Sequence, residues 1–304
     1  MRLGVRVVAA SLGTGVLMIT SCSAAPPPPP AAAPPPAELT AAAALGDFTT
    51  VDFCSLLDLP PLTGGAKPRE TIRSFSTCVV ALPDAQATTV GVGPITNDAQ
   101  RESWETDYPF PGALPPGVRV EQTSKEDGPA CTRYLAFADS VRLTVSIYDS
   151  DTAGKRCAKA DKAVAGALAA VTEKRVQHVD YPAKSLARID PCTILAGREA
   201  DAALEDEYPP GPIGLGKHSC TKALVEVTFL SARTFDGTAT VTVAGQTLSQ
   251  LRDKSSCKLR AERLSNGRGE AVVFTANEVD APATAESCAR AEKVAEFVLP
   301  KLPA

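Results

Sequence analysis

Two sets of four cysteines follow one another along the chain, and this repeat most constrains the fold. The stretch "VDFCSLLD" at 51–58 matches "IDPCTILA" at 189–196, and "CAKADKAVAGALAAV" from Cys157 matches "CARAEKVAEFVLPKL" from Cys288. Two further cysteines lie between these marks in each set. The sets are Cys54, Cys78, Cys131 and Cys157, then Cys192, Cys220, Cys257 and Cys288. The sequence therefore predicts two related modules with equivalent cysteines.

Eight cysteines can be joined in many ways, and the spacings discriminate among them. The first-to-second and third-to-fourth intervals are similar in the two sets, whereas the middle interval changes most. A covalently closed segment tolerates a change of length less readily than a loop outside it. The spacings favour Cys54–Cys78, Cys131–Cys157, Cys192–Cys220 and Cys257–Cys288. Each bond would stabilise the fold by about 3 kcal/mol in the chain-entropy model.

Zinc is the competing explanation for so many cysteines. Structural zinc sites use ligands separated by two to four residues. No two of the eight cysteines are that close, and the chain has only two histidines. We therefore expect disulfides, no metal site and no cofactor.

The N-terminus has the pattern of an export signal. Arg2 and Arg6 precede an apolar run over 7–19, which is short for a membrane span. The run leads into "ITSC", which resembles the lipobox of bacterial lipoproteins, with Cys22 as the lipidated first residue of the mature protein. An ordinary secretory signal with an incidental cysteine is the alternative. Export to an oxidising compartment would agree with the disulfides.

The remaining chain divides at changes of composition. We expect a signal peptide over 1–21, a disordered Pro/Ala-rich linker over 22–46, and four-cysteine modules over 47–182 and 183–304. With 304 residues and 44% hydrophobic residues, each module can bury a core. The net charge of −4 argues against a nucleic-acid partner.

Both modules show the same order of predicted elements. Asp190 and Pro191 are a helix-start signal, and Asp52 occupies the same place in the first module. Strands are predicted at 88–92, 117–121 and 140–148, and then at 225–229, 238–243, 258–264 and 271–274. The alternation over 140–148 predicts a sheet with one buried face. An Ala-rich helix closes each module, so the fold class is α+β, with each module a helix, an antiparallel sheet and a C-terminal helix stapled by disulfides.

The D-P-C-x-x-L start, the second cysteine and the Cys-headed last helix resemble a family of actinobacterial cell-envelope lipoproteins, catalogued as a domain of unknown function. The resemblance covers most of 47–304, although Phe53 replaces the proline in the first module. The family supplies no catalytic residues. The resemblance implies a protein that is anchored to the outer face of the cytoplasmic membrane and binds or senses a partner or ligand.

One stretch imitates a nucleotide-binding loop. In "GPIGLGKHSC" the spacing of Gly211, Gly216 and Lys217 is that of a phosphate loop, but such a loop needs Ser or Thr directly after the lysine. Here His218 follows, and the stretch leads into Cys220 and a strand. We expect a turn that enters a disulfide-tied strand.

Other candidate sites are weaker. His178 and His218 are the only possible imidazole bases, and Ser219 beside His218 should point to the opposite face of a strand. The acidic run Glu205, Asp206 and Glu207 lacks the alternating spacing of a calcium loop. No catalytic residues are therefore predicted.

The aromatic loop at 103–117 is a possible binding surface. It carries Trp104, Tyr108 and Phe110, which could anchor a partner or cap the edge of the sheet. The cleft between the modules is the other expected place for a ligand.

These observations predict a non-catalytic lipoprotein with a binding or sensing role, held on the cell membrane by a lipid at Cys22 and facing outward. A small-ligand or lipid-binding protein with a true cavity is the first alternative. An envelope hydrolase is the second.

Overall fold

The computed structural model describes residues 37–84, 87–97, 102–123, 130–231, 239–265, 267–278 and 282–303. Cys22, the signal peptide and most of the predicted linker lie outside these residues. None of the described helices is long and apolar enough to cross a membrane.

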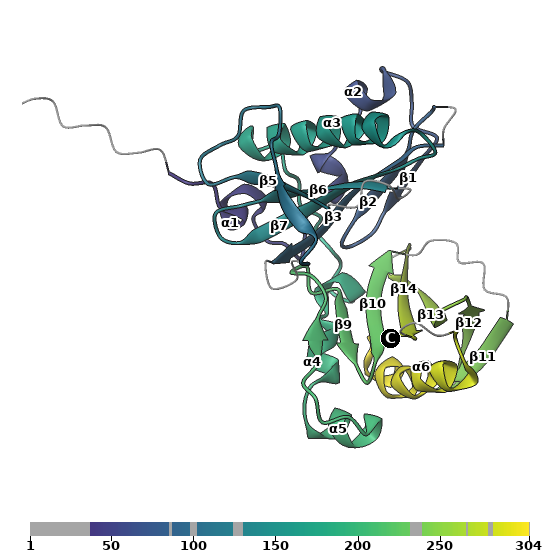
Figure 1. Ribbon diagram of the computed structural model, residues 1–304. Coiled ribbons are helices and arrows are strands. Elements are labelled where there is room, and N and C mark those ends of the chain that lie inside the picture. Colours follow the sequence, from purple (N-terminus) through teal and green to yellow (C-terminus); the bar gives the residue numbers. More distant parts are fainter. Residues whose placement is uncertain are drawn as a thin grey trace, which may run out of the picture. The chain divides into compact units, whose positions relative to one another are not determined.

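The described chain is α+β and contains two seven-stranded antiparallel sheets (Figure 1). The strands of the first sheet are β1 (Glu70–Arg73), β2 (Cys78–Ala81), β3 (Thr89–Asn97), β4 (Glu105–Tyr108), β5 (Arg119–Thr123), β6 (Ala130–Ala136) and β7 (Val141–Tyr148). Those of the second are β8 (Gly211–Pro212), β9 (Ser219–Lys222), β10 (Val225–Ser231), β11 (Ala239–Val243), β12 (Gln246–Arg252), β13 (Ser256–Ser265) and β14 (Arg268–Asn277).

Both sheets have the same topology. The first runs β1-β2-β3-β7-β6-β5-β4, and the second, read from its β8 edge, runs β8-β9-β10-β14-β13-β12-β11. Each strand of one sheet therefore has a counterpart in the other, in both chain order and position. This is the architecture that the repeated cysteines predict.

The four disulfides confirm the pairing inferred from the spacings. They join Cys54 to Cys78, Cys131 to Cys157, Cys192 to Cys220, and Cys257 to Cys288, at sequence separations of 24, 26, 28 and 31. In each module one bond ties an opening turn to the second strand, and the other ties the sixth strand to the last helix. No disulfide joins the two modules.

Two long helices cover the sheets. Helix α3 (Ala153–Thr172) packs on β6 and β7, and α6 (Ala285–Val298) packs on β13 and β14 (Figure 1). Small and branched side chains on the inner face of each helix, such as Ala160, Val164 and Ala291, are fully buried. The other helices are short: α1 (Ala41–Leu45), η1 (Phe53–Leu56), α2 (Pro60–Thr63), η3 (Leu186–Arg188), α4 (Pro191–Leu195), α5 (Arg198–Leu204) and η4 (Leu299–Lys301).

The opening helices differ from the prediction. In the first module the segment after Asp52 is a single 3-10 turn, and in the second α4 has only five residues. The predicted caps are present, since Asp52 and Asp190 accept hydrogen bonds from the amides of Cys54 and Cys192 at 3.0 and 2.9 Å. The helices stop early because the backbone is extended at Leu57 in one module, with a ψ of 120°, and because Gly197 has a φ of 92° in the other.

The predicted linker also extends too far. Ala41–Leu45 forms helix α1, and Ala41 and Leu45 are buried in the first core. Alanine favours the helix, the Thr40 hydroxyl caps it, and Asp139 accepts a hydrogen bond from the amide of Ala41 at 2.9 Å. The folded part thus begins before residue 47.

The strand at 141–148 is buried on both faces, against the prediction of one polar face. Arg142 and Ser146 are buried together with the apolar set. Arg142 forms ion pairs with Glu105 and Glu121, whose side chains are also buried. The charged residue at a polar position of this strand therefore lies in an internal ion-pair cluster and does not face solvent.

Candidate functional site: a pocket between the two modules

At the contact between the two modules, each module packs a side chain against the core of the other. Phe75, at the tip of the β1–β2 hairpin, is 3% exposed and belongs to the core of the second module. Leu215 of the second module packs on the first core, and its amide donates to the carbonyl of Ile95 at 2.8 Å. Residues 37–304 accordingly group as one unit, although each sheet has its own core.

The hairpin that carries Phe75 is positioned by its own backbone and by a neighbouring glycine. The amide of Ser74 donates to the carbonyl of Thr77 at 2.8 Å and closes the turn. Gly93 has a φ of 91°, and a Cβ atom there would overlap the carbonyl oxygen of Ser76. Glycine at this bulge of β3 therefore allows the hairpin tip to lie close.

Phe75 contacts two rings of the second core. Its ring centroid lies 5.3 Å from that of Tyr181, in an edge-to-face arrangement, and 5.3 Å from the imidazole of His218. Edge-to-face pairs add to the energy of apolar burial. Tyr181, in the segment that joins the two modules, is itself buried.

His218 ties this cluster to the N-terminal segment. Its Nε2 lies 3.2 Å from the carbonyl oxygen of Thr49, which requires the ring to donate from that nitrogen. The ring is almost fully buried, and this burial lowers the pKa of His218 to about 4. The imidazole is therefore neutral near pH 7.

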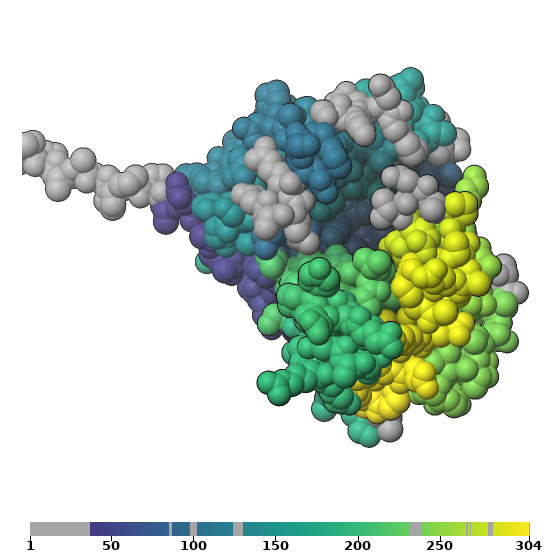
Figure 2. Space-filling model, turned by 60° about the horizontal axis from the view of Figure 1, so that its bottom comes forward, coloured from purple at the N-terminus to yellow at the C-terminus, as the bar shows by residue number. Residues whose placement is uncertain are grey.

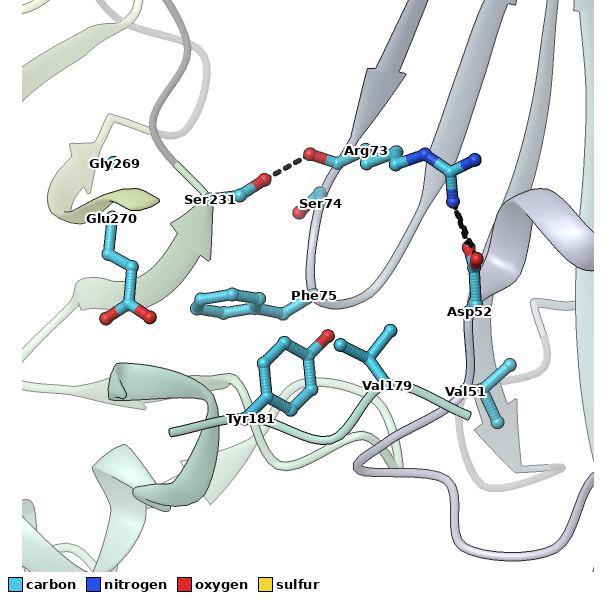
Figure 3. A pocket seen from close by; sticks show the side chains of 10 residues that line it. All are labelled: Val51, Asp52, Arg73, Ser74, Phe75, Val179, Tyr181, Ser231, Gly269 and Glu270. Carbon is cyan, nitrogen blue, oxygen red and sulfur yellow. Dashed lines mark hydrogen bonds and ion pairs between the residues drawn. The ribbon is translucent and has the colours of Figure 1, made fainter. Parts of the chain in front are cut away.

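A pocket of about 540 Å³ opens beside these rings (Figure 3). Its lining comes from both modules and from the segment that joins them: Val51, Asp52, Arg73, Ser74, Phe75, Val179, Tyr181, Ser231, Gly269 and Glu270. This is the cleft that the sequence predicts as a place for a ligand.

The walls of the pocket are fixed by main-chain hydrogen bonds. The amide of Val179 donates to the carbonyl of Thr50 at 2.7 Å, and the amide of Asp52 donates to the carbonyl of Gln177 at 2.8 Å. These bonds align Val51 and Val179 along one wall. Across the pocket, the Ser231 hydroxyl donates to the carbonyl of Arg73 and joins β10 to the first module.

Charged groups stand at the two ends of the pocket. Arg73 and Asp52 form an ion pair of 2.6 Å at one end, and Glu270 lies at the other, with the rings of Phe75 and Tyr181 between them (Figure 3). Glu270 is 3% exposed and accepts hydrogen bonds from the Ser185 hydroxyl at 2.5 Å and the Leu186 amide at 2.8 Å. The site thus combines an aromatic middle with a buried carboxylate.

Of the three aromatic residues predicted as a binding surface, only Trp104 is well exposed. The Tyr108 hydroxyl donates to Asp161 at 2.8 Å, the guanidinium of Arg133 lies 3.9 Å from its ring centre, and Phe110 packs on the first core. Burial, helped by the bond to Asp161, raises the pKa of Tyr108. Trp104, which is 44% exposed, remains on the surface next to the edge strand β4. Tyr108 and Phe110 therefore cap the sheet edge, which is the alternative weighed for this loop.

The other motifs do not assemble into active sites. Gly211 and Lys217 lie in a strand-and-turn entry to β9, and Lys217 is exposed with a φ of 57°. His218 faces Thr49 and Phe75, whereas the Ser219 hydroxyl lies 3.0 Å from that of Thr228, so the two do not form a base–nucleophile pair.

The acidic run has structural partners. Asp206 accepts hydrogen bonds from the amides of Ala223 and Tyr208, and Glu205 pairs with Lys293 of α6 at 3.1 Å. Figure 2 shows the green residues around α5 lying against the yellow residues of α6. In the part of the chain that the structure describes, no group of three or more His, Cys, Asp or Glu residues could hold a metal ion.

Phe75, Tyr181 and Glu270 were not among the predicted site residues. A phenylalanine inside the otherwise polar "RSFSTC" turn was the available signal, since an apolar residue at a hairpin tip needs something to cover it.

Comparisons with known proteins add little to this geometry. No protein-family model matches the chain, and no curated protein does. Among solved structures, the di-domain aromatase/cyclase StfQ of the steffimycin biosynthetic pathway aligns with 13% identity and a TM-score of 0.19, over 86% of this chain and 91% of that one. A score this low establishes neither a shared fold nor an activity.

Proposed function

We propose that the protein is a lipid-anchored, extracytoplasmic binding protein without catalytic activity, and that it holds a small ligand in the pocket between its modules. The observation that carries the proposal is the pocket itself. About 540 Å³ is within the range of small-molecule sites, and an apolar lining with a few polar groups is their usual character.

The construction of the pocket also supports a binding role. Its wall residues are held by main-chain hydrogen bonds and by the buried ring cluster, so little ordering would accompany ligand binding. The polar groups at its ends, Asp52, Arg73 and Glu270, are engaged in ion pairs or hydrogen bonds. They are arranged to orient a ligand, and no nucleophile with an adjacent base lies among the described lining residues.

The anchor is proposed from the N-terminal pattern. The Arg-flanked apolar run and the lipobox-like "ITSC" support lipidation at Cys22, and the four disulfides agree with an oxidising compartment. The proline-rich tract after Cys22 would hold the binding module away from the bilayer.

Filling the pocket tests the binding role. The full protein, purified gently from the cells that make it, should carry a small molecule detectable by native mass spectrometry. Ser74→Trp places an indole in the pocket and should abolish that mass difference, while Thr240→Trp, on the exposed edge strand β11, should retain it. A protein that never carries a ligand, or one whose ligand persists in Ser74→Trp, would argue against this pocket.

A further inference from the structure

We infer that the pocket selects a small organic cation, an ammonium group attached to an apolar body. This inference rests on the proposed binding function and assigns the chemical class of the ligand. It depends on the charge of Glu270 and on what surrounds that charge.

Glu270 is a buried carboxylate that forms no ion pair with a described residue. Its two hydrogen-bond donors, the Ser185 hydroxyl and the Leu186 amide, are neutral. Arg263, its cross-strand neighbour on β13, donates to two main-chain carbonyls instead. Among the described residues, no lysine, arginine or histidine forms an ion pair with it. A buried charge is costly unless it is paired, and a carboxylate can accept more than two hydrogen bonds.

The opposite end of the pocket does not change this balance. Arg73 is already paired with Asp52 at 2.6 Å, and its side chain is 61% exposed, so it contributes little attraction for an anion. The opposite charges of Asp52 and Arg73 cancel each other. Of the charged residues that line the pocket, only Glu270 is then left without a counterion in the lining.

The aromatic middle supplies the second recognition element. The rings of Phe75 and Tyr181 line the pocket between its two ends (Figure 3). Aromatic faces attract ammonium groups and also cover apolar surface. A carboxylate at the end of an aromatic pocket suits a ligand whose ammonium reaches Glu270 and whose apolar body lies along the rings.

Three probes of matched size separate charge from shape. We would measure the binding of 3-phenylpropylammonium, 3-phenylpropanol and 3-phenylpropionate to the full protein by calorimetry at neutral pH. The cation should bind about tenfold or more tightly than either of the others, because only the ammonium group can form a charge-assisted hydrogen bond with the carboxylate of Glu270. This comparison uses the unmodified protein and does not depend on the folding of any variant.

Two carboxylate variants then locate the preference. Glu270→Gln should bind cation and alcohol equally, whereas Glu296→Gln, an exposed position on α6, should keep the preference of the unmodified protein. If the alcohol or the carboxylate binds as tightly as the ammonium and Ser74→Trp blocks it, the pocket binds ligands but the cation assignment is wrong. If none of the probes binds, the cation assignment is likewise wrong, and the binding role is judged separately by the ligand that the protein carries from cells.

Discussion

The carbonyl oxygen of Thr49 lies 3.2 Å from Nε2 of His218, 169 positions further along the chain. The imidazole donates this bond from a buried site, where burial favours its neutral form, and the bond crosses the contact between the two modules. The stability of the contact is therefore coupled to the protonation of one side chain.

The first prediction concerns this coupling. The pKa of His218 is lowered to about 4, against an ordinary value of 6.5, so the unfolded chain binds the proton more tightly. The stabilising effect is fully present above pH 6.5 and is lost as the pH falls from 6.5 toward 4. Between pH 7 and pH 5 the free energy of unfolding should fall by about 2 kcal/mol from this group.

Urea unfolding at both pH values measures the effect. His218→Gln can still donate to Thr49 and should lose most of this pH dependence, whereas His178→Gln, at an exposed position, should retain it. An unchanged pH dependence in His218→Gln would show that the imidazole is not the group responsible.

The second prediction concerns Phe75. Phe75→Ala removes a buried ring from the second core and should lower the free energy of unfolding by about 3–5 kcal/mol. Tyr208→Ala removes a ring that is 81% exposed and should cost less than about 0.5 kcal/mol. Because Phe75 joins the modules, two separate unfolding transitions are expected in its variant, monitored by circular dichroism. Similar losses in the two variants would mean that Phe75 does not anchor the contact.

The third prediction compares two lysines of one segment. Lys222 is fully buried, pairs with Asp201 at 2.7 Å and donates to the carbonyl of Tyr208, so Lys222→Ala should destabilise by about 3 kcal/mol. Lys217 is exposed, and Lys217→Ala should change the free energy of unfolding by less than about 0.5 kcal/mol. Neither the unmodified protein nor this variant should bind ATP. Thermal unfolding ranks the two variants, and an isothermal titration with ATP provides the separate check on Lys217.

The fourth prediction concerns the anchor. Cys22→Ala should abolish metabolic labelling with a fatty acid and release the protein from the membrane fraction. Ser21→Ala, which keeps a small residue before the cysteine, should remain labelled. Labelling that survives in Cys22→Ala would identify the N-terminus as an ordinary secretory signal.

The sequence predicted those parts of the fold that depend on local pattern or on repetition. The cysteine intervals led to the correct disulfides because both modules carry the same closed segments. Alternation located β7 and β10, but no strand was predicted at β1, β2, β4, β6, β8, β9 or β12. Of these, β1 and β8 are short edge strands with little apolar content. The opening helices were overestimated, because a cap such as Asp190 fixes where a helix starts and not how far it continues.

The candidate site could not be read from the sequence for a different reason. Its residues come from distant segments, and their roles arise only when the modules meet. Tyr181 lies between Asp180 and Pro182, and this context gives no sign that Phe75 packs against its ring. Glu270 follows a turn and resembles a surface residue until Ser185 and Leu186 fold over it.

The place of Phe75 in the second core also fixes an order of events. A chain is made from its N-terminus, so the first module can close its two disulfides once Cys157 has emerged. At that moment Phe75 stands uncovered at the hairpin tip, since Tyr181 and His218 have not yet been made. Strand β14, which brings Gly269 and Glu270, comes later still. A chain interrupted before Tyr181 would therefore carry a finished first module, an exposed aromatic ring and no pocket.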